Sequence, residues 1–153
     1  MIKVHKLSRP GKYNSLTLEM IEALSEQVAS PDGSRVLILI GDENHFSSGA
    51  DLKGDFFKIF EKLAHLYRQI QNSSKIVIAA IDGYCLAGGF GLAAAADLAL
   101  ATPEAVFQLP ECRRGLIAPL AASLSQNLLP RRLLLELTLS GEPLSSSRLY
   151  EAG

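Results

Sequence analysis

Apolar residues gather in two short uninterrupted runs, at 36–40 and 76–81. Runs of this length that are rich in β-branched residues are typical of strands buried on both faces of a parallel sheet. Residues 2–7 instead alternate apolar and polar, with Ile2 and Val4 on the apolar side, which predicts a half-buried edge strand with a solvated His5. Residues 97–101 are predicted to form a short strand, and residues 106–107 are expected to be extended.

Between these predicted strands, apolar residues recur at helical spacing. After a predicted N-cap at Thr17, one apolar face recurs at helical spacing over Leu18, Ile21, Leu24 and Val28. A second helix is predicted over 55–72, and shorter helices over 119–128, 131–139 and 145–153. The core face predicted for the second helix comprises Phe56, Phe60, Leu63, Tyr67 and Ile70. Strands that alternate with helices predict an α/β fold with a mainly parallel sheet.

The stretch 76–91 reads as a strand, a glycine-rich turn over 86–91 and an alanine-rich helix. Such a turn leaves free N–H groups at the positive end of a helix, where an oxyanion can be held. The alternative is that the glycines only let the helix pack close to the sheet. A second small-residue turn, at 47–50, follows the other buried strand. Because ligands bind beyond the carboxyl ends of parallel strands, both turns are predicted to face one pocket.

Composition narrows the class of protein. A length of 153 residues fits a single domain, and 48% apolar with 20% charged residues is an ordinary globular balance. A net charge of −1 gives no electrostatic footprint for nucleic acid or an anionic membrane. Cys85 and Cys112 lack metal-ligand spacing, which favours reduced thiols and a cytoplasmic location. The leucine-rich run 133–139 is apolar on more than one face and predicts a patch that drives self-association.

Several motifs in order resemble the enoyl-CoA hydratase/isomerase (crotonase) superfamily. They are FSSGADL at 46–52, IDGYCLAGGFGLAAAADLALAT at 81–102 and FQLPE at 107–111, flanked by RPGKYNSLT at 9–17 and LSGEPLSS at 139–146. The resemblance implies a crotonase-like spiral of ββα units, an acyl-CoA thioester substrate, and trimers or dimers of trimers. It implies no metal and no cofactor, since coenzyme A is part of the substrate. Members usually run on by about a hundred residues, so residues 1–153 are expected to be a truncated core domain without the C-terminal helical trimerisation region. A genuine short protein, a truncated reading frame and a piece of a larger protein all fit this expectation.

The resemblance also implies roles for individual residues. The backbone N–H groups of Ala50 and Gly88 match the two donors of the family's oxyanion hole. Ser48, Asp51 and Leu52 match the strand edge that holds the nucleotide part of coenzyme A. These five positions therefore form the predicted substrate-binding set.

Glu111 matches one of the two glutamates that hydratases use as acid and base, whereas the other aligns with Gly91. Without the resemblance, a solvated surface acid would be the simpler interpretation of Glu111. Because two carboxylates suit the addition of water and one suits a proton shuttle, double-bond isomerisation is favoured over hydration. Gly91→Glu is then expected to raise hydration, provided that the backbone tolerates a side chain. Cys112 has no histidine near it in sequence, which disfavours a nucleophile there. The alternative function is an inactive acyl-CoA-binding or oligomerisation module.

Overall fold

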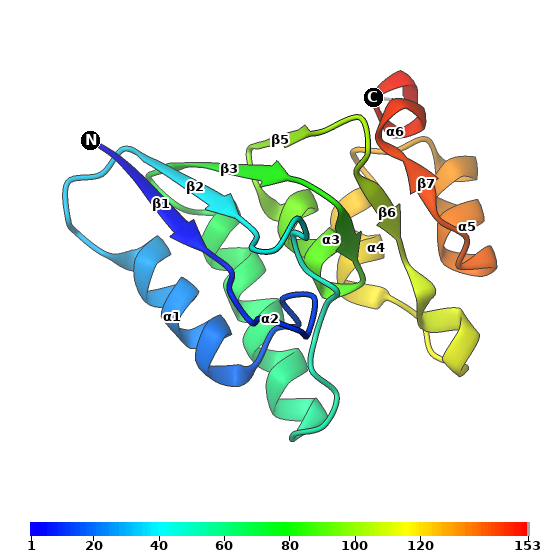
Figure 1. Ribbon diagram of the computed structural model, residues 1–153, viewed down its shortest axis with the longest axis horizontal. Helices are drawn as coiled ribbons and strands as arrows, with labels where there is room; N and C mark the ends of the chain where they lie inside the picture. Colours follow the sequence, from blue (N-terminus) through cyan, green and yellow to red (C-terminus); the bar gives the residue numbers. More distant parts are fainter. Residues whose placement is uncertain (153) are drawn as a thin grey trace.

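A parallel four-stranded sheet forms one layer of the protein and helices form the next. The computed structural model describes residues 1–152, and its larger sheet has the strand order β1-β2-β3-β5. Its strands are β1 (Ile2–Lys6), β2 (Val36–Ile40), β3 (Ile76–Ile81) and β5 (Leu98–Ala101), all parallel. Helices α1 (Leu18–Ala29), α2 (Phe56–Gln71) and α3 (Gly88–Ala95) lie together below this sheet in Figure 1. The predicted α/β architecture is confirmed.

A smaller sheet lies beside the first, and the helices of the carboxyl-terminal part of the chain lie near it (Figure 1). In it, β4 (Tyr84–Leu86) pairs parallel with β6 (Val106–Gln108), and β6 pairs antiparallel with β7 (Leu144–Ser145). The remaining elements are the 3₁₀-helix η1 (Pro110–Arg114), α4 (Pro119–Ser125), α5 (Arg131–Ser140) and α6 (Ser146–Ala152). The sequence did not predict β4, which separates β3 from the glycine-rich turn. Gly83, at φ +57°, makes the change of sheet, and a Cβ there would overlap Asn44 O.

The two long helices begin where side chains cap them. The Thr17 hydroxyl accepts a hydrogen bond from Met20 N at 3.3 Å, which confirms the predicted N-cap of α1. The Asp55 carboxylate accepts from Lys58 N at 3.1 Å at the start of α2. The buried face of α2 comprises Ile59, Leu63, Leu66, Tyr67 and Ile70. Phe56 and Phe60 were wrongly placed in this face, because the buried stripe starts at Ile59 and leaves Phe56 exposed and Phe60 only half-buried.

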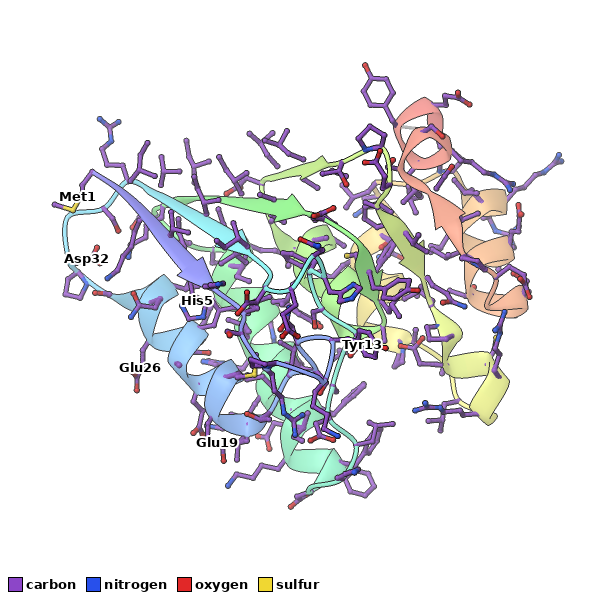
Figure 2. The ribbon with its side chains drawn as sticks, viewed as in Figure 1. Met1, His5, Tyr13, Glu19, Glu26 and Asp32 are labelled. Atoms are coloured by element: carbon purple, nitrogen blue, oxygen red, sulfur yellow. The ribbon has the colours of Figure 1, made fainter. Side chains whose placement is uncertain are left out.

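The sequence predicted that β2 and β3 are buried on both faces, but one face of the larger sheet is not covered. The helices cover only the face that carries Leu37, Leu39 and Val77, which are all fully buried. β1 is inverted relative to the prediction: Ile2 and Val4 are exposed, whereas Lys3 and His5 are half-buried. The His5 side chain lies on the α1 side of β1 (Figure 2), and burial lowers the pKa of its imidazole. His5 is therefore not the solvated residue that the alternation indicated.

The uncovered face of the larger sheet is a contiguous apolar surface. Its most exposed members, named here the apolar sheet face, are Ile2, Val4, Ile76, Leu98 and Leu100, each 51–65% exposed. They belong to consecutive cross-strand rows, since Ile2 aligns with Val36 and Ile76, and Val4 aligns with Ile38, Ile78 and Leu98. In α5, by contrast, Leu133 and Leu137 are buried, and only the flanking Leu135 and Leu139 are exposed. The larger exposed patch is therefore on the sheet and not on the leucine-rich helix.

We expect this surface to make the protein self-associate, because contiguous exposed apolar patches of several strands are unusual on monomers. The double variant Val4→Lys/Leu100→Lys should shift light scattering from oligomer toward monomer. Phe57→Lys is the matched control, since Phe57 is 83% exposed but lies on α2. A parent protein that scatters as a monomer at high concentration would contradict the expectation.

Candidate active site

The two small-residue turns lie side by side at the junction of the sheets. Residues 46–47 run along β4: Phe46 N and Ser47 N both donate to Tyr84 O, at 3.0 and 2.9 Å. Leu86 N donates in return to Ser47 O at 2.8 Å. A Cβ built on Gly88 would lie 3.3 Å from Ala50 N, so the two predicted donor residues are neighbours. The two turns are therefore neighbours, and the pocket that they were predicted to share stays a prediction.

Gly49 is the residue that allows the turns to approach so closely. It has φ +96°, and a Cβ there would lie 2.6 Å from Ala87 Cβ and 2.9 Å from Gly88 N. Both the backbone conformation and the available space therefore require glycine. Leu16 holds the turn from the other side, because Leu16 N donates to Gly49 O and Asp51 N donates to Leu16 O, at 2.7 and 2.9 Å.

Two backbone donors are left free by this arrangement. Within residues 1–152, neither the Ala50 N–H nor the Gly88 N–H has an acceptor in the protein. Gly88 is the first residue of α3, so its N–H is one of the donors that no helical carbonyl can satisfy. It also lies at the positive end of the helix dipole. A pair of adjacent free donors at a helix start is suited to an oxygen that acquires negative charge.

Ala87 sets the direction of one of these donors. It caps α3 with φ 51° and ψ −119°, a conformation that is costly for a residue with a Cβ. Two hydrogen bonds keep it there: Ala87 N donates to Gln108 O at 2.9 Å, and Gly91 N donates to Ala87 O at 3.1 Å. The torsion at Ala87 orients the peptide that ends in the Gly88 N–H. No sequence pattern indicated this strained residue.

Glu111 lies in η1, directly after the strand β6 and residue Leu109. Its carboxyl group is half-buried, and in the part of the chain that the structure describes its Oε2 has no hydrogen-bond partner. Burial raises the pKa of this carboxyl, although hydrogen bonding at its own backbone and the charge of Arg114 oppose the shift. These properties differ from those of a solvated surface acid. A half-buried carboxyl group with a raised pKa makes Glu111 a candidate for a functional site.

Tyr67, in α2, packs against the donor turn. Its hydroxyl donates to Gly88 O at 2.7 Å, and its side chain is almost completely buried. Burial raises the pKa of the phenol, and the negative charge of Glu111 raises it further. The phenol therefore stays protonated and donates to the turn that carries the Gly88 N–H. Sequence reasoning placed Tyr67 only in the core face of α2, because helical periodicity carries no information about what the ring meets.

The position where a second carboxylate was considered, Gly91, has no room for one. A Cβ on Gly91 would lie 2.5 Å from Tyr67 Oη and 2.7 Å from Tyr67 Cζ. Gly91 is buried in α3 and lacks a positive φ, so its backbone would accept a side chain but the Tyr67 ring would not. The expectation that Gly91→Glu alone raises hydration is therefore wrong on steric grounds.

The other predicted binding residues lie beside Ala50 with their backbone donors largely in use. Ser48 N donates to Tyr13 O at 2.9 Å, and the Asp51 N–H is held by Leu16. The Asp51 carboxylate forms an ion pair with Arg9 at 2.7 Å, and hydrogen bonding from Arg9 lowers the pKa of that carboxyl. Leu52 is 42% exposed. Contacts from this edge to a ligand would therefore come mainly from carbonyl oxygens and from the Leu52 side chain.

The remaining chemistry-bearing residues show no second centre. Cys85 is buried, which raises the pKa of its thiol, and Cys112 is a free thiol on η1. Among residues 1–152, no three His, Cys, Asp or Glu side chains are placed to hold a metal ion. None of the described helices is both long and apolar enough to cross a membrane. A cavity of about 740 Å³ flanks α3 but is lined by residues such as Phe90, Leu98 and Leu149, not by Ala50, Gly88 or Glu111.

Comparison with known proteins decides the family. The family profile described as enoyl-CoA hydratase/isomerase matches residues 1–153. The chain belongs to the enoyl-CoA hydratase/isomerase family. It is similar to the crystal structure of human enoyl Coenzyme A hydratase domain-containing protein 3, with a TM-score of 0.94 and 29% identity, over 99% of this chain and 64% of that one. The crotonase fold that the resemblance implied is confirmed.

Relatives by sequence carry hydratase names. The probable enoyl-CoA hydratase echA6 of Mycobacterium tuberculosis is 35% identical over 115 residues, which are 72% of this chain and 47% of the relative. Mevalonyl-coenzyme A hydratase sidH of Aspergillus fumigatus is 35% identical over 96% of this chain and 58% of the relative. The chain thus spans about half the length of the relatives it matches.

Proposed function

We propose that this chain acts on acyl-CoA thioesters and stabilises the enolate of the thioester. The observation that supports the proposal most directly is the pair of adjacent, unpartnered N–H groups at Ala50 and Gly88. Removing a proton from C2 of a thioester places negative charge on its carbonyl oxygen. Two preorganised donors hold that oxygen, and the loss of one such donor typically costs about 3 kcal/mol of transition-state stabilisation.

Glu111 is the acid–base group in this proposal, and the favoured reaction is double-bond isomerisation. The Glu111 carboxylate takes a proton from C2 of a 3-enoyl thioester, and the electron pair of the C–H bond delocalises onto the thioester oxygen. The protonated Glu111 then returns the proton to C4, which moves the double bond to C2–C3 and restores the carbonyl. A raised pKa suits this role, because the group must accept a proton and release it again.

Substrate binding is proposed to use the edge at Ser48, Asp51 and Leu52, next to the Ala50 donor. Arg9 holds the Asp51 side chain beside this edge. Leu52 offers an exposed apolar side chain to a ligand. We further propose that the protein works as a homo-oligomer, to which the apolar sheet face contributes.

Paired assays test this function. Purified protein is given crotonyl-CoA, whose hydration lowers the enoyl absorbance, and 3-hexenoyl-CoA, whose isomerisation raises it. Isomerisation that exceeds hydration supports the proposal, and the reverse ratio would favour a hydratase. If neither thioester turns over but both bind, the protein is an acyl-CoA-binding module instead.

The pH dependence of kcat/KM provides a separate check on Glu111. The proposed base works only when ionised, so activity should fall as the pH drops through the pKa of Glu111 in the free enzyme. Because burial raises that pKa, the acid limb should lie above the ordinary glutamate value of about 4.5. A rate that stays constant from pH 8 down to pH 4 would contradict the assignment.

A further inference from the structure

The Tyr67 side chain packs against Gly88 of the donor turn and against Gly91, the position that aligns with the second glutamate of hydratases. We infer that Tyr67 determines which reaction the site performs, by occupying the space where a second acid–base side chain and its bound water would stand. The inference rests on the proposed function and adds a specificity-determining residue to it. Tyr67 acts by exclusion and so needs no proton transfer of its own.

The position of the ring is fixed at both ends. The hydroxyl donates to Gly88 O at 2.7 Å, in the same residue that offers one oxyanion donor. The ring comes from α2, whose buried face continues on either side of it with Leu63, Leu66 and Ile70. A side chain that is 3% exposed and tied by its hydroxyl cannot turn aside to admit water.

Gly91 is the counterpart that the ring requires. The glycine has ordinary helical torsions in α3, so no turn or positive φ accounts for it. Glycine in a helix interior lowers the free energy of unfolding by roughly as much as one hydrogen bond contributes to it. A packing reason is therefore needed for the glycine. That reason is the approach of Tyr67 Oη, Cζ and Cε2 to 2.5, 2.7 and 2.9 Å from where a Cβ would lie. The large side chain of Tyr67 therefore fills the space that the missing side chain of Gly91 leaves free.

Tyr67 and Gly91 together restrict the chemistry beside Glu111. Adding water across a double bond requires a water held against C3 while a proton is delivered to C2, and a second polar side chain on the opposite flank suits this task. Where a side chain at Gly91 would supply that second group, the structure instead has a neutral phenol whose proton is already donated to Gly88 O. One carboxylate then remains to carry the proton, and isomerisation results.

Five proteins test the inference: the parent, Gly91→Glu, Tyr67→Ala, the double variant of these two substitutions, and Tyr67→Phe. Gly91→Glu alone should lower the melting temperature and give no hydration, because its side chain overlaps the ring. Tyr67→Ala opens the space, so the double variant should hydrate crotonyl-CoA at least about tenfold faster, relative to isomerisation, than the parent does. Tyr67→Phe keeps the ring without its hydroxyl and should retain the low hydration-to-isomerisation ratio of the parent.

Thermal stability gives a readout that does not depend on turnover. Gly91→Ala should destabilise the parent but have little effect in the Tyr67→Ala background. Gly89→Ala is the matched control: its Cβ would meet Ser47 O at 2.6 Å, so its penalty should persist in both backgrounds. The inference is overturned if Gly91→Ala lowers thermal stability equally in the two backgrounds. It is also overturned if a folded Gly91→Glu variant hydrates crotonyl-CoA while Tyr67 is present. A parent that turns over no thioester would refute the proposed function, while the stability cycle would still decide whether Tyr67 fills the space.

Discussion

Glu111→Gln is expected to lower isomerisation by about 10²–10⁴-fold, the usual contribution of a positioned general base. Glutamine keeps the shape of the side chain and can still donate and accept hydrogen bonds, but it cannot take a proton from C2. Acyl-CoA binding should persist, because the Ala50 and Gly88 donors belong to other segments of backbone. The measurement is steady-state kinetics on 3-hexenoyl-CoA, with affinity determined separately by calorimetry.

Glu142→Gln is the matched control for Glu111→Gln. Glu142 is also a glutamate of the carboxyl-terminal half, but it is exposed and pairs with Arg113 at 2.8 Å. Exposed pairs of this kind contribute little to stability, so this variant should retain the activity of the parent. Circular dichroism establishes that both variants are folded. A folded Glu111→Gln with undiminished turnover would show that Glu111 is not the acid–base group.

The positions of the principal strands and helices could be predicted because each has a local signal. Thr17 caps α1 where the pattern places a cap, and β2 and β3 coincide with the two apolar runs. The inverted exposure of β1 could not be predicted, because alternation identifies two faces but not which of them the helices cover. Continuous apolar runs likewise indicated strands buried on both faces, whereas Ile76 is 51% exposed.

The candidate site was predictable where it depends on sequence motifs and not where it depends on packing between distant segments. Ala50 and Gly88 follow from motifs, and the structure brings them together. Tyr67 meets Gly88 and Gly91 from 21 positions or more earlier in the chain, and neither residue alone indicates the contact. A helical glycine without a turn is the one sequence signal that points toward a large neighbour. The η1 turn that carries Glu111 also had no periodic pattern to indicate it.

Ala50→Pro should reduce the affinity for an acyl-CoA to that for coenzyme A itself. Proline has no N–H, so the variant removes one of the two donors to the thioester oxygen. The change should leave the turn in place, because Ala50 N has no acceptor in the protein and Leu16 still bonds to Gly49 O and Asp51 N. Gly49 has no Cβ to meet the proline ring.

Calorimetric titration separates the thioester contact from the rest of the ligand. In the parent, a short acyl-CoA should bind more tightly than free coenzyme A, because only the acyl-CoA offers a carbonyl to the two donors. In Ala50→Pro this difference should disappear, and the affinity for free coenzyme A should stay the same. Ala50→Gly retains the N–H and is the control that keeps the difference. Turnover should fall in parallel by about 10²–10³-fold, as expected for the loss of one oxyanion donor. If Ala50→Pro binds the acyl-CoA as tightly as the parent does, the thioester is not held between Ala50 and Gly88.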